Sequence, residues 1–227
     1  NSEEMDYNQL YKSKGGYLVI LVGDTGVGKT HLLNKYVKGV LPRNPVPTIG
    51  VEFATKTVTL KNGERVKAQI WDTGKQATIF SRTVTVSIDN NGVQMKRKVG
   101  ITGGLAGYQV YDITREKTFN NVKRWLENIK EQADPDVVIM LVGNKTDLPD
   151  RVVRREEGKS LADHEGILFD ETSAKESGNI GGIFEKLLEG TVFAVAQKST
   201  CEEAVGARDG QDPSNQSNEG QQSIETL

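Results

Sequence analysis

The chain has 227 residues, enough for one sizeable hydrophobic core with residues left over, but cramped for two full domains. Its formal charge of −2 gives no overall basis for binding nucleic acid or a membrane surface. A lone cysteine, Cys201, excludes an internal disulfide and fits a reducing compartment, and no apolar run approaches the length needed to span a bilayer.

Residues 1–16 are expected to form a flexible lead-in before the first recognisable motif. Residues 17–22 are an unbroken apolar run, typical of a parallel strand buried on both faces. Residues 31–37 have helical character, so the intervening loop is expected to close onto a helix N-terminus, where an anion is favoured. The loop sequence fits the phosphate-binding pattern of two glycines separated by four residues and followed by Lys and Thr: Gly23, Asp24, Thr25, Gly26, Val27, Gly28, Lys29 and Thr30.

Each residue type in this loop suits one part of nucleotide binding. Gly23 and Gly28 allow the backbone to turn and approach phosphate oxygens, and the loop N–H groups can surround the β-phosphate. Lys29 can reach the β- and γ-phosphates, and the Thr30 hydroxyl can ligate Mg²⁺. The alternative is a glycine-rich turn that contains a lysine by chance, and the flanking strand and helix favour the nucleotide site.

The remaining pattern alternates strands with helices, as in a doubly wound α/β sheet. Three prolines within residues 39–47 predict an exposed loop. Alternating residues on both sides of Asn62-Gly63 predict a hairpin with a two-residue turn. Helical spacing of apolar residues around Trp125 predicts a core-facing stripe without a cofactor role. Further expected elements are strands at 108–111, 137–142 and 167–169, helices at 156–165 and 180–196, and a disordered tail over 197–227.

A second motif, Asn-Lys-x-Asp at residues 144–147, follows the expected strand 137–142. It therefore lies at the carboxyl edge of the sheet, where ligands bind in such folds. Asp147 can accept hydrogen bonds from guanine N1–H and the exocyclic amine, which adenine cannot match, while Asn144 braces the site and the Lys145 stem lies over the base. After the next strand come three further residues expected at the guanine, where the backbone N–H of the second would reach O6: Ser173, Ala174 and Lys175.

Taken together, these motifs resemble the Rab family of Ras-like small GTPases, most closely its recycling-endosome branch. The residues that carry the resemblance are 23–30, 48–53, 67–73, 111–114, 144–147 and 171–175. It covers residues 17–196, apart from the interval after Thr73. The resemblance implies a P-loop NTPase fold with a Ras-like mixed six-stranded sheet, one strand of which is antiparallel, flanked by helices.

The resemblance also implies a function: a monomeric, Mg²⁺-dependent GTP/GDP switch in vesicle traffic. Thr30 and Thr48 would bind Mg²⁺ through their hydroxyls, Asp72 would hold the ion through water, and Thr48 would also sense the γ-phosphate. Thr48 lies 18 positions after Thr30, which is the spacing of the family. Effectors, an exchange factor and a GTPase-activating protein are the expected partners, and the expected location is cytoplasmic with peripheral association to endosomal or vesicle membranes.

Residues 75–102 depart from the family. Lys75 replaces a glycine whose N–H touches the γ-phosphate, and Gln76 occupies the position of the water-orienting glutamine without its usual neighbours. Residues 83–88 and 93–99 flank a polar turn and predict an isolated hairpin, which is marginal in water. Two explanations remain open: a true insertion that rebuilds the second switch, or translation of a retained intron, since codons for Gly74-Lys75 can contain a splice-donor-like sequence.

Two smaller departures concern the base and the membrane. Leu41 occupies the position of a phenylalanine that packs against guanine in the family, which predicts faster nucleotide release. The sequence has no prenylation motif around Cys201, so membrane association is expected from the resemblance alone.

Because residues 75–102 depart from the family, two functions stay open: a slow GTPase that depends on an activating protein, or a guanine-nucleotide-binding scaffold with little hydrolysis. A P-loop kinase or ATPase is disfavoured by Asn144 and Asp147.

Overall fold

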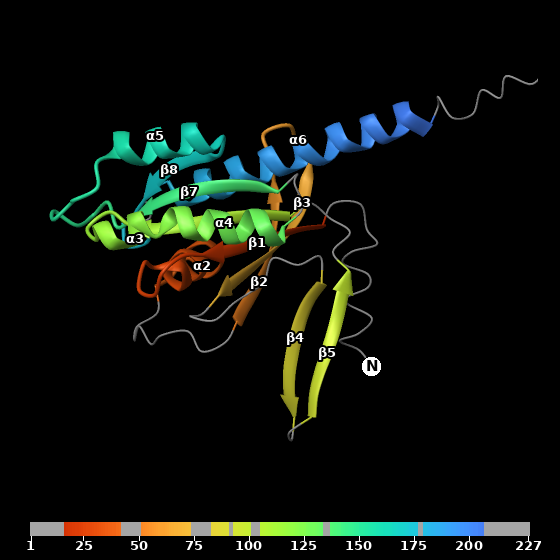
Figure 1. Cartoon of the computed structure of the whole chain (residues 1–227), viewed down its shortest axis with the longest axis horizontal. Coiled ribbons are helices and arrows are strands. Elements are labelled where there is room, and N and C mark those ends of the chain that lie inside the picture. Colours follow the sequence, from red (N-terminus) through yellow and green to blue (C-terminus); the bar gives the residue numbers. More distant parts are fainter. Residues whose placement is uncertain are drawn as a thin grey trace, which may run out of the picture.

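Six strands form one mixed sheet at the centre of the chain (Figure 1). A computed structural model describes residues 16–41, 51–73, 83–90, 93–100, 105–133, 137–176 and 179–206. The strand order is β2-β3-β1-β6-β7-β8, and all neighbours are parallel except β2 and β3, which are antiparallel. The strands are β1 (Gly16–Val22), β2 (Val51–Thr59), β3 (Arg65–Thr73), β6 (Leu105–Asp112), β7 (Val138–Asn144) and β8 (Leu168–Thr172). The expected Ras-like sheet is confirmed.

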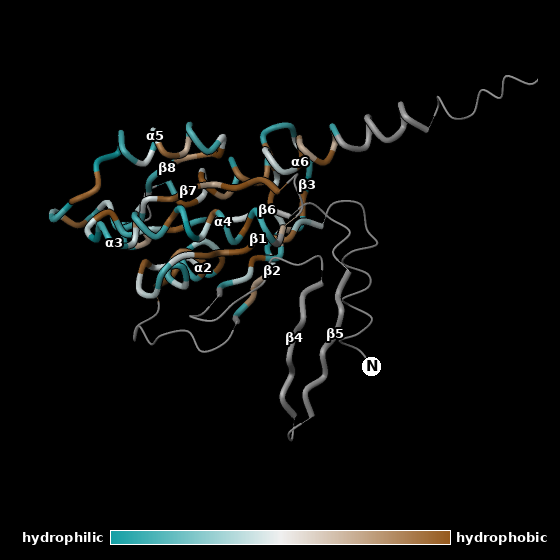
Figure 2. The backbone as a smooth tube through the Cα atoms, viewed as in Figure 1, coloured by the Kyte–Doolittle hydropathy of each residue, from teal (hydrophilic) through white to brown (hydrophobic). Residues whose placement is uncertain are grey.

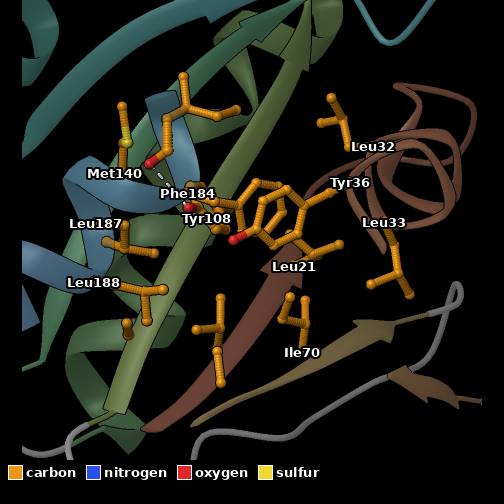
Figure 3. Packing of buried hydrophobic residues seen from close by; sticks show 14 of the residues in the cluster. Leu21, Leu32, Leu33, Tyr36, Ile70, Tyr108, Met140, Phe184, Leu187 and Leu188 are labelled. Atoms are coloured by element: carbon orange, nitrogen blue, oxygen red, sulfur yellow. Dashed lines mark hydrogen bonds between the residues drawn. The ribbon is translucent and has the colours of Figure 1, made fainter. Parts of the chain in front are cut away.

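Helices cover both faces of the sheet, which explains why its central strands are mostly apolar (Figure 2). One face packs against α2 (Lys29–Lys38) and α6 (Ile180–Gly206). The other face packs against α4 (Val122–Gln132) and α5 (Arg155–Glu165), with the short α3 (Glu116–Asn120) preceding α4. Side chains that meet between the sheet and α2 and α6 are drawn in Figure 3.

The core beneath α2 and α6 contains a group of three aromatic side chains. The rings of Tyr36 and Phe184 stack with centroids 3.8 Å apart, and Tyr108 packs against Phe184 at 4.8 Å (Figure 3). The Tyr108 hydroxyl donates to the Ile183 carbonyl oxygen at 3.0 Å, so this buried polar group is paired. These contacts join α2, β6 and α6, and thereby fix the helix that follows the phosphate loop.

The predicted two-residue turn of the β2–β3 hairpin is wrong in detail. The β2–β3 hairpin closes through three residues, Lys61 to Gly63, because the Leu60 N–H donates to the Glu64 carbonyl at 2.8 Å. Gly63 has a φ of 83°, but Asn62 does not have a positive φ, and a two-residue type I′ turn requires both. The Asn62 side chain instead accepts from the Glu64 N–H at 2.9 Å, which favours the longer loop.

The last helix extends to Gly206, whereas a disordered tail was expected from residue 197. Residues 197–206 contain no proline, and each residue added to an existing helix gains a hydrogen bond without the cost of nucleation. This explains why a polar segment continues the helix. Residues 207–227 of the expected tail lie outside the described residues, as does the lead-in at 1–15. Among the helices described, none is both long enough and apolar enough to cross a membrane.

The unusual interval between β3 and β6 contains a second, two-stranded sheet. It pairs β4 (Thr83–Asn90) with β5 (Val93–Gly100) in antiparallel register, and it pairs with no strand of the main sheet (Figure 1). The hairpin expected here is therefore present. Both explanations for its origin remain predictions, because the fold does not distinguish an inserted segment from a translated intron.

Candidate functional site

Three loops at the carboxyl ends of β1, β7 and β8 meet at one edge of the sheet. Asn144, at the end of β7, connects the other two loops and is only 1% exposed. Its side-chain amide donates to the Val27 carbonyl at 2.8 Å, and its oxygen accepts from the Ala174 N–H at 3.3 Å. The motifs that the sequence places far apart are thus held together by one side chain, as expected for a brace of the site.

The phosphate loop needs glycine at two positions for lack of space as well as for backbone conformation. Gly23 has a φ of 134° and Gly28 a φ of 101°, and L-residues rarely adopt either. A Cβ at Gly23 would collide with the Val110 carbonyl, and one at Gly28 would collide with the Asn144 side chain. Gly28 also caps α2 without a side-chain hydrogen bond, so the first N–H groups of that helix face the loop.

Lys29 lies in this loop as the sequence predicts. Its ammonium donates to the carbonyl oxygens of Gly23 at 2.7 Å and Asp24 at 3.0 Å, and the residue is 8% exposed. Burial lowers the Lys29 pKa, while the nearby Asp72 and Asp24 act in the opposite direction. A phosphate brought to the loop would favour the charged form of Lys29 further. The ammonium is therefore positioned for an anionic ligand.

Two of the three expected Mg²⁺ ligands are in contact. The Thr30 hydroxyl donates to Asp72 Oδ2 at 2.5 Å, which joins the start of α2 to the end of β3. Hydroxyl and carboxylate oxygens are the ligands that Mg²⁺ prefers, and the ion commonly takes few protein ligands together with substrate phosphates. The described residues contain no cluster of three or more His, Cys, Asp or Glu suited to a metal ion. Thr30 and Asp72 fit such a shared Mg²⁺ site.

The expected guanine-binding residues also lie together. The side chain of Asp147 is only 7% exposed, and its Oδ1 accepts from the Ser173 hydroxyl at 2.6 Å. The Ser173 oxygen in turn accepts from the N–H groups of Lys175 at 3.2 Å and Glu176 at 3.1 Å. The Lys175 ammonium lies 3.8 Å from Asp147 Oδ2. The carboxylate that would read the base is therefore oriented before any ligand arrives.

Asp112 is a site residue that the sequence reasoning missed. Its side chain is 1% exposed, and its Oδ2 accepts from Lys145 at 2.5 Å and from Arg115 Nε at 2.8 Å. Its Oδ1 accepts from the Thr114 N–H and hydroxyl. Burial raises the Asp112 pKa, but the hydrogen bonds from Lys145, Thr114 and Arg115 outweigh burial and leave the pKa lowered.

The ion pair with Asp112 fixes Lys145, a residue of the guanine motif. Lys145 has a φ of 74°, which is uncommon for a bulky residue. Its ion pair with Asp112 fixes the side chain that is expected to lie over the base. Arg115 extends the same cluster towards the phosphate loop, with Nη2 at 3.5 Å from the Thr25 carbonyl oxygen. Asp112 lies within residues 111–114, one of the segments that carry the family resemblance. That resemblance was the only indication in the sequence that Asp112 belongs to the site.

Trp125 and Asn121 were also missed, although Trp125 was expected in the core-facing stripe. Trp125 packs partly buried against the core, as predicted, but its indole N–H also donates to Asp24 in the phosphate loop at 3.0 Å. Asn121 donates to the other oxygen of Asp24 at 2.7 Å. No sequence pattern indicated this contact, because residues 24 and 125 are linked only by the packing of α4 on the sheet.

The remaining expected site residues are placed only in part. Thr48 and Gln76 lie outside the described residues, so their roles stay predictions. Leu41 is half-buried and packs against the core cluster that contains α2 and α6. Its contribution to guanine binding likewise stays a prediction.

Comparison with known proteins shows the family to which this chain belongs. The family model described as "Ras family" matches residues 18–192. The chain belongs to the Ras family. Ras-related protein RABA1b of Arabidopsis thaliana is 40% identical over 88% of this chain and 82% of its own. Ras-related protein RABA2b of the same plant is 38% identical over 93% and 90%, and Ras-related protein RIC2 of Oryza sativa subsp. japonica is 38% identical over 91% and 86%.

These matches confirm the resemblance to Rab-type small GTPases. Ras-family GTPases generally bind GTP or GDP together with Mg²⁺. This Ras-family chain is therefore a GTP-binding switch protein.

Proposed function

We propose that this chain hydrolyses GTP to GDP with Mg²⁺ and acts as a Rab-type switch in vesicle traffic. The observation that carries the proposal is the contact of 2.5 Å between the Thr30 hydroxyl and Asp72, which brings two Mg²⁺ ligands to the end of the phosphate loop. Bound Mg²⁺ would neutralise charge that develops on the phosphates. Thr30 and Asp72 would hold the ion, with Thr48 as the expected third residue.

Residues of this chain would divide the work of the reaction. Lys29 would bind the β-phosphate of the leaving GDP and the γ-phosphate that is transferred to water. The N-terminus of α2 would stabilise their negative charge. Gln76 would orient the attacking water. Asp147, Ser173 and Ala174 would select guanine and hold the nucleotide in place. Effectors, an exchange factor, an activating protein and peripheral attachment to endosomal or vesicle membranes are part of the same proposal, on the strength of the family.

A second candidate is supported by the interval between β3 and β6. There the chain forms a separate two-stranded sheet, Lys75 replaces a glycine of the family, and Gln76 lacks the neighbours that the water-orienting glutamine has in the family. A side chain in place of a glycine that needs a positive φ would cost about 1–2 kcal/mol and misplace the loop. The alternative is a protein that binds guanine nucleotides and partners but hardly hydrolyses GTP.

Nucleotide binding is tested first, with the purified full chain. We expect fluorescent GDP to bind and fluorescent ADP not to bind, and Asp147→Ala to abolish the preference for guanine. Asp163→Ala is a matched control, because Asp163 is an exposed aspartate on α5 that pairs with Lys159. Binding of ADP as tight as that of GDP would contradict the guanine site.

Hydrolysis is tested separately by single-turnover measurements with GTP and Mg²⁺. The first candidate predicts turnover above the buffer rate and a fall to that rate in Gln76→Ala. GTP that stays bound but is hydrolysed no faster than in buffer would overturn the first candidate and support the second. Addition of an arginine-supplying activating protein, which accelerates related enzymes by about 10³–10⁵-fold, would extend the range of the assay.

A further inference from the structure

The side chain of Asp24 connects the phosphate loop to helix α4. Its Oδ2 accepts from Asn121 Nδ2 at 2.7 Å, and its Oδ1 accepts from Trp125 Nε1 at 3.0 Å. Both oxygens therefore have a donor on the same helix. We refer to these two hydrogen bonds as the Asp24 contact.

The donors are placed for this contact by the geometry of the helix. Asn121 and Trp125 are four residues apart, so they lie on one face. Asn121 is also the N-cap of α4, where the helix dipole favours a negative charge. On the core side, Val122, Leu126 and Ile129 are fully buried and hold α4 against the sheet. The Asp24 contact thus joins the loop to a firmly packed element.

Asp24 also holds the lysine of the phosphate loop through its main chain. Its carbonyl oxygen accepts from the Lys29 ammonium at 3.0 Å. A carboxylate in a loop that binds phosphate would repel its ligand if it turned inward. The two donors of α4 keep the carboxylate directed at the helix while the carbonyl faces Lys29.

From this arrangement we propose that Asn121 and Trp125 are positioning residues for the nucleotide. They hold Asp24 so that the loop and Lys29 keep the conformation that retains GDP. The inference rests on the proposed nucleotide binding. It predicts that loss of the indole N–H accelerates GDP release, although Trp125 is not expected to touch the nucleotide.

The test measures release of fluorescent GDP from the full chain in Trp125→Phe, Asp24→Ala and the double variant. Trp125→Phe keeps an aromatic ring and removes the donor, and loss of a hydrogen bond to a charged acceptor corresponds to about tenfold faster release. Because Asp24→Ala removes both bonds, the double variant should release GDP no faster than Asp24→Ala alone. Asp24→Asn keeps an acceptor for the indole and should give an intermediate rate.

Leu126→Val is the matched control, since Leu126 neighbours Trp125 on α4 but faces only the core. A purely structural role would make Trp125→Phe and Leu126→Val release GDP equally fast at an equal loss of thermal stability. That result, or release at the wild-type rate in Trp125→Phe, would overturn the inference. If Asp24→Ala does not fold, the comparison of Trp125→Phe with Leu126→Val still decides. Wild-type protein that binds no GDP would instead overturn the proposed function itself.

Discussion

Replacing Asp112 with asparagine tests whether the buried carboxylate holds the guanine motif in place. Asp112→Asn removes the charge that Lys145 and Arg115 share at 2.5 and 2.8 Å. A hydrogen bond to a charged group contributes about 1.5–3 kcal/mol, and the bond to Arg115 counts towards the low end because its side chain is 44% exposed. We therefore expect Asp112→Asn to lower the free energy of unfolding by about 2–4 kcal/mol.

The same change should also affect the nucleotide. Without its ion pair, Lys145 is no longer held at the position expected over the base, and GDP release should be about tenfold faster, for a loss of about 1.4 kcal/mol. Stopped-flow release of fluorescent GDP and urea denaturation are the two assays. Asp170→Asn is the control, because Asp170 on β8 pairs with Arg155 at 3.0 Å and, within the described part of the chain, contacts none of the expected nucleotide-binding residues through its side chain.

The pH dependence of stability supplies a further check. The Asp112 pKa is lowered from its ordinary value of 3.8 in the folded protein, so its stabilisation is fully present above that value. It is lost as the pH falls through the lower, folded-state pKa. The stability difference between wild type and Asp112→Asn should therefore be constant near neutral pH and shrink below pH 3.8. GDP release no faster than in Asp170→Asn at equal stability would refute the role of Asp112.

Three further substitutions give independent tests. Gln109→Leu should raise the free energy of unfolding by about 2 kcal/mol in urea denaturation, because neither buried amide atom of Gln109 has a hydrogen-bond partner among the described residues. Gln69→Leu is the control: Gln69 is also buried but does have interactions, so its replacement should give no such gain. Leu41→Phe should slow GDP release about fivefold if an added ring contributes about 1 kcal/mol against guanine, and equal rates in stopped flow would contradict this. Gly158→Ala should lower the free energy of unfolding by about 2 kcal/mol, since the added Cβ would lie 2.5 Å from the buried Tyr111 hydroxyl. Gly181→Ala on α6 is the control: its Cβ meets open space, so the protein should be equally or slightly more stable in thermal unfolding.

Much of the fold could be predicted because its signals are local. The apolar run at 17–22 and the alternation around Asn62-Gly63 each identify an element from a few neighbouring residues. Boundaries were less accurate for a physical reason. The end of α6 depends on the low cost of extending an existing helix, and the β2–β3 loop length depends on which residue adopts a positive φ.

The sequence by itself determined the phosphate loop and the guanine motif, because glycine conformation, a lysine and an acceptor for guanine require particular residues at particular spacings. Only the tertiary structure decided how these loops are held. Asp112 pairs with Lys145, and Asp24 with Trp125, across 33 and 101 positions of the chain. Such pairs leave no periodic pattern, since they arise only when parallel strands and the helices packed on them bring distant residues to the same edge of the sheet.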